Sequence, residues 1–263
     1  MSGIPFFLRF DDITDLDARI VRFVEGSLAN GFPVLAAVIP EQLHPDATEW
    51  LIKLRGKYPQ LLDIAQHGYR HKDHFSGAAH GEFCQGRADK LIAQDILAGA
   101  VIMDDAFGDE WQRIFVPPFN HICRYAIQVL IRMRFLGVST IYSPPDTFRK
   151  RFSMCRDMIA YQFGSALPAW KNMWRVEGRL PCVSPVIDVG ADYAGSRLAS
   201  TNALDEMVSG LISAEGQVLG IMIHHWLYRD MTEIDDLLAW GKRVRDRCEL
   251  SPVSVSQLIR DFS

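Results

Sequence analysis

Side chains that bind metals or move protons follow short apolar runs in this 263-residue chain. Asp11 and Asp12 stand directly after the first of these runs. If the run is a β-strand, its alternation points the two carboxylates in different directions, so we expect them to have different roles. Adjacent aspartates after a strand are also common in turns and helix caps. The pair therefore indicates chemistry only in combination with other groups.

A second group is formed by His67 and His71, which follow a later apolar run. Histidines four residues apart can direct both imidazoles at one metal ion from a single helical turn. His74 and His80 lie nearby, so this segment holds four of the eight histidines of the chain. The spacing favours a metal site, and the alternative is a solvated loop that happens to be rich in histidine.

Two further motifs end apolar runs. Pro117 and Pro118 precede an aromatic residue, and prolines at this place end a strand and stiffen the loop, which suits a plain turn or the wall of a pocket. His224 and His225 follow a late apolar run. An imidazole there could act as a general acid or base, because its ordinary pKa lies near neutrality. A buried, hydrogen-bonded histidine is the alternative.

The elements that must position these groups are indicated by apolar runs that alternate with stretches of helical spacing, a pattern typical of βα units. The predicted strands are 5–10, 34–39, 61–65, 114–116, 138–142, 185–189 and 219–223. The predicted helices are 15–29, 45–57, 87–104, 122–135, 202–214 and 233–247, with caps at Asp15, Asp46 and Thr232. No linker or repeat divides the chain, so we predict one α/β domain over 1–263, with an irregular segment near 149–180.

The composition is that of an ordinary globular protein, with 48% hydrophobic and 23% charged residues. The net charge is −4 and no basic block is present, so nucleic acid is not expected as a partner. No apolar stretch is long enough to span a membrane, and the N-terminus lacks the pattern of a secretory signal. We therefore expect a cytoplasmic protein. The sequence leaves open whether it forms a homo-oligomer. The five cysteines are widely spaced, which predicts neither a disulfide framework nor a structural zinc site.

The order of the motifs resembles the polysaccharide deacetylase family, whose domain has the NodB-homology fold. The family pattern reads roughly Thr-Phe-Asp-Asp-Gly, His-Ser/Thr-x-x-His, Arg-x-Pro-x-Gly, a segment with Asp and Trp, and Leu-x-Leu-His. The positions that match in this chain are Phe10 to Asp12, His67 to His71, Val116 to Asn120, Asp188 to Tyr193 and Ile221 to His224. The resemblance covers most of the chain and implies a distorted (β/α) barrel of about seven strands.

The resemblance also implies roles for these residues. Asp12, His67 and His71 would bind one divalent metal, zinc first, with cobalt, nickel or manganese as alternatives. Asp11 would be the base that takes a proton from water, and His224 would protonate the departing amine. The residues expected to contact an N-acetylated carbohydrate substrate are Pro118, Phe119, Asn120 and Tyr193.

Two departures from the family pattern fall in the third motif, whose arginine orients the base in the family. The arginine of the third family motif aligns with Val116, and its glycine aligns with Asn120. Arg9, on the same strand face as Asp11, is one candidate to orient the base, and Arg70 or an arginine within 149–179 is another.

The function implied is that of a metal-dependent hydrolase that removes the N-acetyl group from an N-acetylated sugar or a surface-polysaccharide precursor. An amidohydrolase of the same fold that acts on a non-sugar amide or ureide is one alternative. A non-catalytic carbohydrate-binding relative is the other. Both alternatives stay open at this point.

Overall fold

Strands and helices alternate along the chain, as predicted. The computed structural model describes residues 3–74, 81–140, 173–177, 179–185, 187–189, 201–212 and 218–262. The strands are β1 (Ile4–Ile13), β2 (Val34–Val38), β3 (Leu62–His67), β4 (Ile114–Val116), β5 (Gly137–Ser139), β6 (Met173–Val176), β7 (Leu180–Val183), β8 (Ile187–Asp188), β9 (Leu219–His224) and β10 (Leu250–Pro252). The helices are α1 (Ala18–Ala29), α2 (Pro45–Lys57), α3 (Asp89–Phe107), α4 (Arg124–Arg132), α6 (Thr201–Ile212), α7 (Met231–Cys248) and α8 (Val255–Phe262).

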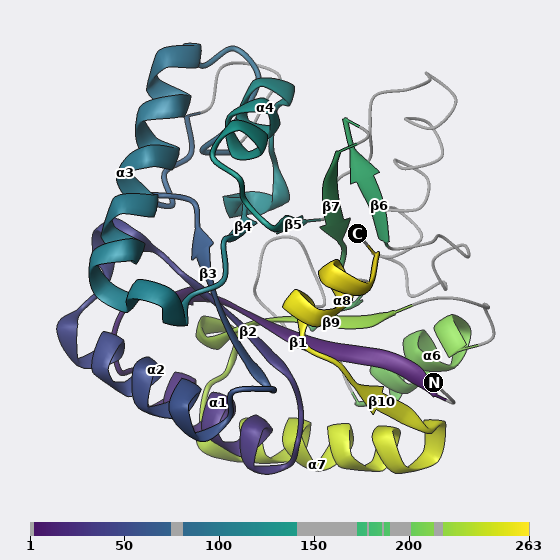
Figure 1. The fold of residues 1–263 in the computed structure, drawn as a ribbon. Helices are drawn as coiled ribbons and strands as arrows, with labels where there is room; N and C mark the ends of the chain where they lie inside the picture. Colours follow the sequence, from purple (N-terminus) through teal and green to yellow (C-terminus); the bar gives the residue numbers. More distant parts are fainter. Residues whose placement is uncertain are drawn as a thin grey trace.

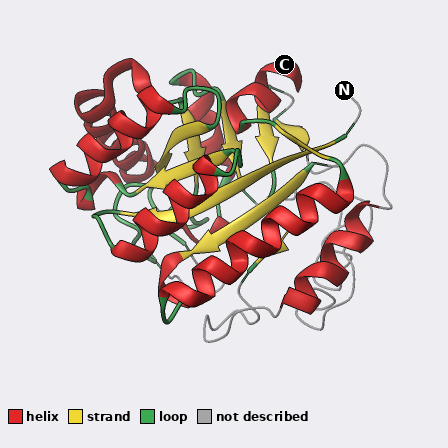
Figure 2. Ribbon diagram, turned by 90° about the horizontal axis from the view of Figure 1, so that it is seen from below, coloured by secondary structure: helices red, strands yellow, loops and turns green. Residues whose placement is uncertain are grey.

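The strands form one curved sheet in the order β6-β7-β5-β4-β3-β2-β1-β9-β8, and β10 also pairs with β1. Every pair is parallel except the antiparallel β6–β7 pair. Helices α1, α2, α3, α4 and α7 flank the strands on the outside of the curve, whereas α8 lies inside it (Figures 1 and 2). This arrangement is the distorted (β/α) barrel that the sequence predicted.

Strand alternation divides β1 between two environments. Leu8 and Phe10 belong to the large core cluster under the outer helices, whereas Phe7 belongs to a second cluster inside the curve. Because side chains alternate along a strand, Arg9 and Asp11 share the inner face with Phe7. The same parity in β9 brings Met222 and His224 to the inner side, opposite residues of β1.

Helix α8 closes the amino-terminal end of the strands from inside. Leu258 and Ile259 pack in the inner cluster with Phe7. Asp63, near the start of β3, accepts hydrogen bonds from the Ser256 backbone nitrogen at 2.7 Å and from its Oγ at 2.9 Å. Burial raises the pKa of the Asp63 carboxyl, although the bonds from Ser256 oppose this change. The apolar residues of α8 fill this end of the barrel, whereas Arg9, Asp11 and His224 lie toward the carboxyl ends of the strands.

Several elements differ from the sequence prediction. The hairpin β6–β7 lies in and next to the segment expected to be irregular, and β10 and α8 were not predicted. Residues 141–172, which include most of that segment and the end of one predicted strand, lie outside the described residues. The cap predictions are wrong. The capping residues are Asp17 for α1, His44 for α2 and Asp230 for α7, not Asp15, Asp46 and Thr232.

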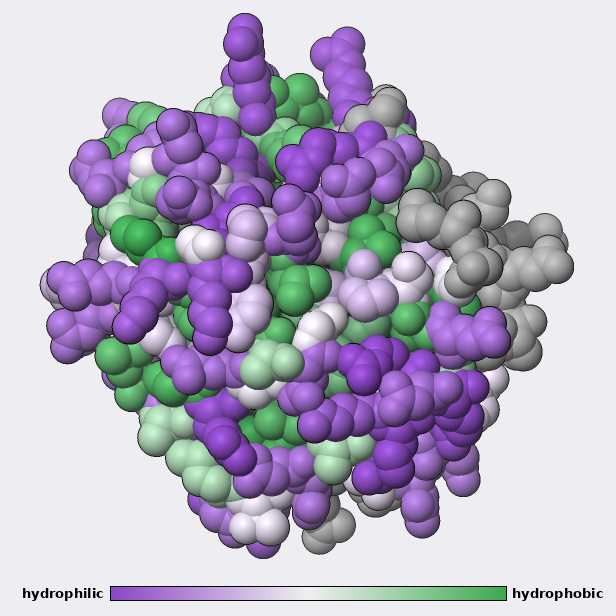
Figure 3. Space-filling model, turned by 60° about the horizontal axis from the view of Figure 1, so that its bottom comes forward, coloured by the Kyte–Doolittle hydropathy of each residue, from purple (hydrophilic) through white to green (hydrophobic). Residues whose placement is uncertain are grey.

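The surface drawn in Figure 3 is mixed. Its apolar side chains form small patches that polar side chains separate. Among the described helices, none combines the length and the apolar character that crossing a membrane would require.

Candidate active site

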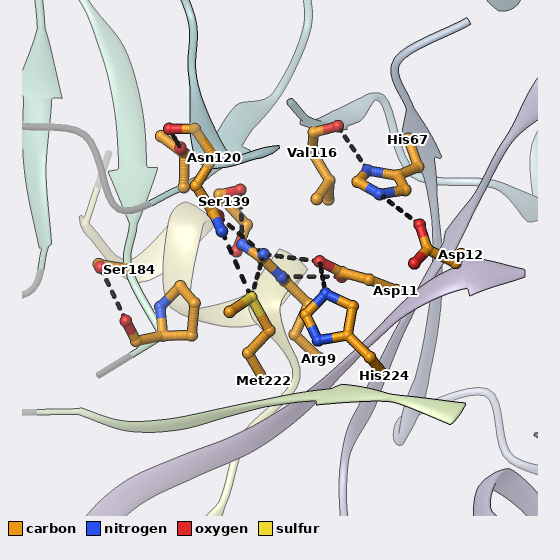
Figure 4. Close-up of polar contacts among 12 residues, drawn as sticks. Arg9, Asp11, Asp12, His67, Val116, Asn120, Ser139, Ser184, Met222 and His224 are labelled. Atoms are coloured by element: carbon orange, nitrogen blue, oxygen red, sulfur yellow. Dashed lines mark hydrogen bonds and ion pairs between the residues drawn. The ribbon is translucent and has the colours of Figure 1, made fainter. Parts of the chain in front are cut away.

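Side chains from three strands meet at the carboxyl ends of β1, β3 and β9 (Figure 4). Asp11 and His224 are register partners across β1 and β9, so the sheet itself places the carboxylate beside the imidazole. His67 is the last residue of β3. The carboxyl ends of barrel strands are where such folds build active sites.

Asp11 forms a bidentate ion pair with Arg9. Nε of Arg9 donates to Oδ1 of Asp11 at 2.9 Å, and Nη2 donates to Oδ2 at 2.7 Å. The two side chains are 0% and 2% exposed, respectively. Burial alone would raise the pKa of Asp11, but the positive charge of Arg9, helped by His67 and His224, holds it below its ordinary value. The carboxylate is therefore ionised, and its plane is fixed.

The guanidinium of Arg9 is itself anchored on further acceptors. Its Nη1 donates to the Ser139 carbonyl at 3.0 Å, and its Nη2 donates to Oδ1 of Asn120 at 2.8 Å (Figure 4). Among the described arginines that the sequence offered, Arg9 is the one paired with Asp11, whereas Arg70 pairs with Glu41 at 2.9 Å.

Asp12 points away from Asp11 because the strand is bulged at this place. The register between β1 and β2 shifts between Phe10 and Ile13, and Asp12 has a positive φ of 65°. Bulges of this kind redirect side chains next to active sites. The different directions expected for the two carboxylates are confirmed.

The redirected carboxylate of Asp12 faces two imidazoles. Its Oδ1 lies 3.2 Å from Nε2 of His67 and 3.2 Å from Nε2 of His71. Its other oxygen, Oδ2, accepts a hydrogen bond from Nε1 of Trp226 at 3.1 Å. The pKa of Asp12 is well below its ordinary value: burial opposes this shift, but the hydrogen bond and charge of His67 outweigh it.

The two histidines are not on a helix, so the expected single helical turn is wrong. His67 ends β3, and the chain then turns through Gly68 and His71, which both have positive φ values, of 60° and 55°. The turn nevertheless brings the two rings together, with centroids 5.1 Å apart.

The cluster has the geometry of a site for one metal ion. Nδ1 of His67 lies 2.9 Å from the Val116 carbonyl. A carbonyl only accepts, so Nδ1 carries the proton and a neutral ring presents the lone pair of Nε2 to the carboxylate of Asp12. Such a pair needs a cation between the two atoms, either a proton or a metal. The donor atoms of Asp12, His67 and His71 lie within 4.8 Å of one another. Tetrahedral zinc with bonds of about 2.0–2.1 Å requires ligand atoms about 3.3 Å apart, so these residues fit the ion.

The protonation of the two imidazoles differs with their surroundings. Burial lowers the pKa of His67, but its hydrogen bond to the carboxylate of Asp12 and the charges of Asp11 and Asp12 raise it above its ordinary value. For His71, burial and the nearby charge of His67 lower the pKa. Without a metal, the carboxylates therefore favour the charged form of His67, whereas burial favours the neutral form of His71, the form that binds metals.

His224, and not His225, faces the carboxylates. Its Nε2 lies 3.8 Å from Oδ2 of Asp11, and its ring lies beside that of Trp226, with centroids 5.3 Å apart. The ring of His225 stacks instead on Phe10, with centroids 6.4 Å apart, and burial lowers its pKa.

The residues expected to contact substrate lie in different places. Phe119 is 39% exposed, and its ring centroid is 4.5 Å from that of His71. Pro118 is buried and packs on Gly68 so closely that a Cβ on that glycine would lie 2.4 Å from it. Asn120 turns inward to Arg9, and Tyr193 lies outside the described residues. Of the three that the structure describes, Phe119 presents an exposed surface beside His71.

Glu82 belongs to this neighbourhood but was not singled out from the sequence. Its carboxylate accepts hydrogen bonds from the backbone nitrogens of Tyr69 and Arg70, between the two histidines. A single glutamate in a loop gives no periodic signal of burial, so nothing in the sequence pattern could have identified it.

Comparison with known proteins identifies the fold. No protein-family model and no curated protein sequence matches this chain. A candidate polysaccharide deacetylase from Mycobacterium smegmatis is similar in structure, with a TM-score of 0.65, 12% identity and coverage of 99% of this chain and 91% of that one. A family 4 acetyl xylan esterase from Clostridium thermocellum, in complex with a cobalt ion, has a TM-score of 0.58 and 9% identity over 97% of this chain and 90% of that one.

A third solved structure is a CE4 family pseudoenzyme from Bacillus anthracis. Its TM-score is 0.53, with 8% identity and coverage of 98% of this chain and 66% of that one. At such identities the likeness concerns the fold. The chain has the fold of the CE4 deacetylases, which confirms the NodB-type barrel that the sequence motifs predicted.

Proposed function

We propose that the protein is a metal-dependent hydrolase that removes the acetyl group from an N-acetylated carbohydrate, either a sugar or a surface-polysaccharide precursor. One observation carries the proposal. Three side chains that could hold a metal ion lie next to a buried, ionised carboxylate and an imidazole, all at the carboxyl ends of the barrel strands. A binding module would not need both a base and an acid at this place.

Asp12, His67 and His71 would hold the metal, with zinc as the first candidate and cobalt, nickel or manganese as alternatives. When bound, the ion polarises a carbonyl oxygen and lowers the pKa of water. The bond from His67 to Val116 orients one ligand, and the bond from Trp226 to Asp12 leaves a single oxygen of this carboxylate facing the imidazoles. The cobalt ion in the structurally similar acetyl xylan esterase supports a metal in this fold.

Asp11 takes the proton from the attacking water. Each oxygen of an ionised carboxylate has two lone pairs, and Arg9 occupies one on each oxygen. A second lone pair therefore stays open to a proton, while the guanidinium keeps the carboxylate ionised. Arg9 is the residue that orients the base in this proposal, in place of the arginine that the family pattern has elsewhere.

His224 delivers a proton to the nitrogen that leaves. Its Nε2 lies 3.8 Å from Oδ2 of Asp11, too far for a good hydrogen bond but close enough for both groups to reach the same amide. The proposal thereby gives the roles of base and acid to two different residues, which are register partners on β1 and β9.

Two aromatic rings flank the cluster. Trp226 is 48% exposed and lies beside His224, and Phe119 lies beside His71. Large, rigid aromatic faces of this kind provide contact area for a sugar ring. They are the residues we assign to substrate contact, whereas Asn120 serves the orientation of Arg9.

The test is release of acetate from N-acetylglucosamine oligomers by protein loaded with zinc or cobalt. Asp11→Asn and His224→Ala should each lower kcat by about 10²–10⁴-fold, the usual contribution of a general base or acid. His225→Ala is the matched control, because this neighbouring imidazole stacks on Phe10 instead, and it should retain turnover.

Two outcomes would replace the proposal. Metal binding without acetate release from any N-acetylated carbohydrate would favour the non-catalytic alternative, for which the CE4 family pseudoenzyme is a structural precedent. Hydrolysis of non-sugar amides or ureides alone would favour the amidohydrolase.

A further inference from the structure

We propose that Glu82 is a positioning residue of the metal centre, whose buried carboxylate fixes the turn between His67 and His71 and so places the second imidazole. The inference rests on the metal role proposed above for Asp12, His67 and His71. It concerns a residue that neither the motifs nor the family pattern points to.

The carboxylate of Glu82 accepts hydrogen bonds from two successive backbone N–H groups. Oε2 accepts from the Tyr69 nitrogen at 3.0 Å, and Oε1 accepts from the Arg70 nitrogen at 2.7 Å. Glu82 is 0% exposed. Burying a carboxylate costs free energy unless its oxygens accept hydrogen bonds, and here the backbone N–H groups of the turn donate them. Side chain and turn therefore depend on each other.

The turn needs this support because its backbone is strained. His71 has a φ of 55°, in the left-handed region that is unfavourable for a residue with a Cβ. Such conformations persist only where the surroundings enforce them. The carbonyls of the turn are also bound: Gln66 Nε2 donates to Gly68 O at 2.9 Å, Glu41 N to Tyr69 O at 3.0 Å and Gln42 Nε2 to Arg70 O at 2.7 Å. Glu82 supplies the acceptors for the two N–H groups.

Glu82 is in turn held rigidly from both sides. The backbone nitrogen of Gly81 donates to Oδ1 of Asp73 at 2.7 Å. Phe83 forms a β-bridge with Ile122, and its ring lies fully buried against Phe115, with centroids 5.2 Å apart. The carboxylate thus links the hydrophobic core to the second histidine.

The carboxylate of Glu82 leaves no room for a side chain at position 68. A Cβ on Gly68 would lie 2.2 Å from Oε2 of Glu82 and 2.4 Å from Pro118. Gly68 also has a φ of 60°, which favours glycine. Glu82 and Pro118 therefore pack against Gly68, and any larger residue at this position would displace them.

Glu82→Gln perturbs this contact with little change in shape. A carboxylate accepts at both oxygens, whereas an amide accepts at one oxygen and donates at its nitrogen. One of the two N–H groups of the turn would then face another donor. His67 stays anchored by its strand and by Val116, so the displacement falls on His71. Loss of such a supporting bond typically weakens metal binding about 10–100-fold.

The experiment is a titration of Zn²⁺ into the metal-free full chain, with Asp63→Asn as the matched control. Asp63 is also a buried carboxylate, 1% exposed, that accepts one backbone N–H, but it lies at the opposite end of β3. We expect the Kd for Zn²⁺ to rise about 10–100-fold in Glu82→Gln and to stay unchanged in Asp63→Asn. Hydrogen exchange should show the Tyr69 and Arg70 amides protected in the metal-free wild type and exposed in Glu82→Gln alone.

Equal Kd values for the wild type and Glu82→Gln would overturn the inference, as would equal weakening in Asp63→Asn, which would indicate general loosening. If Glu82→Gln does not fold, Gly68→Ala displaces the same carboxylate from the other side and should raise the Kd in the same way, and an unchanged Kd there would again overturn it. A wild-type chain that binds no Zn²⁺ would instead refute the proposed function.

Discussion

The buried pair of Arg9 and Asp11 should show strong energetic coupling in a double-mutant cycle. The two side chains are 0% and 2% exposed and share two hydrogen bonds of 2.9 and 2.7 Å. Removing one partner of a buried pair leaves an uncompensated charge and costs about 3–5 kcal/mol. Arg9→Met and Asp11→Asn should each lower the free energy of unfolding by about this amount.

The double variant should cost much less than the two single changes together. Arg9→Met also leaves the acceptors on Ser139 and Asn120 without their donor, but this cost is present in the double variant too and cancels in the cycle. The remaining coupling energy should be about 2–3 kcal/mol, the upper part of the range for residues in contact. Urea unfolding of the metal-free protein at pH 7 measures it.

The pH dependence gives an independent check of the same pair. The pKa of Asp11 in the folded chain lies below the unfolded value of 3.8. Its contribution to stability is therefore present above the unfolded value and is lost as the pH falls through the folded value. In Arg9→Met the charge that opposes burial is lost, so Asp11 takes up a proton at a higher pH than in the wild type. The difference in stability between the two proteins should therefore be largest at neutral pH and should shrink as the pH falls. Single costs that add to within about 0.5 kcal/mol, or a difference that does not change with pH, would refute the reasoning.

Three other variants test neighbouring features. Trp226→Phe keeps the ring but removes the N–H that binds Asp12, so the Kd for Zn²⁺ should rise about 10-fold; an unchanged Kd would show that the indole does not orient the ligand. Asp17→Ala removes the cap of α1 and should cost about 1 kcal/mol in urea unfolding. The pKa of Asp17 is lowered to about 2, chiefly by its bond with Arg19, so this cost should fade as the pH drops from 3.8 to 2, and a constant cost would contradict it. Asp63→Asn should lower the stability by about 1–3 kcal/mol but leave acetate release intact, and a loss of turnover would count against its purely structural role.

The sequence could predict which strands carry the site because parallel strands bring their carboxyl ends to one edge. Asp11, His67 and His224 lie there for that reason. Strand parity also made Arg9 one of the candidates to orient Asp11, beside Arg70 and an arginine within 149–179. The end of β1 was harder to predict, since the two aspartates suggest a turn, whereas the strand continues to Ile13 and carries them in extended and bulged conformations.

Features that depend on contacts between distant segments could not be predicted. The positive φ of His71 has no signature in the spacing of two histidines, which fits a helix equally well. Glu82 acts through a turn twelve and thirteen residues before it in the chain. The short elements β10 and α8 are stabilised by packing against β1 and the inner face of the barrel, and not by a long periodic pattern.

The metal content of the purified chain tests the central claim most directly. Elemental analysis after reconstitution with zinc and exhaustive dialysis should find about one ion per wild-type chain and none in the His67→Ala/His71→Ala variant, because two of the three ligands are then lost. A wild-type chain that retains no metal, or a variant that retains as much as the wild type, would contradict the account.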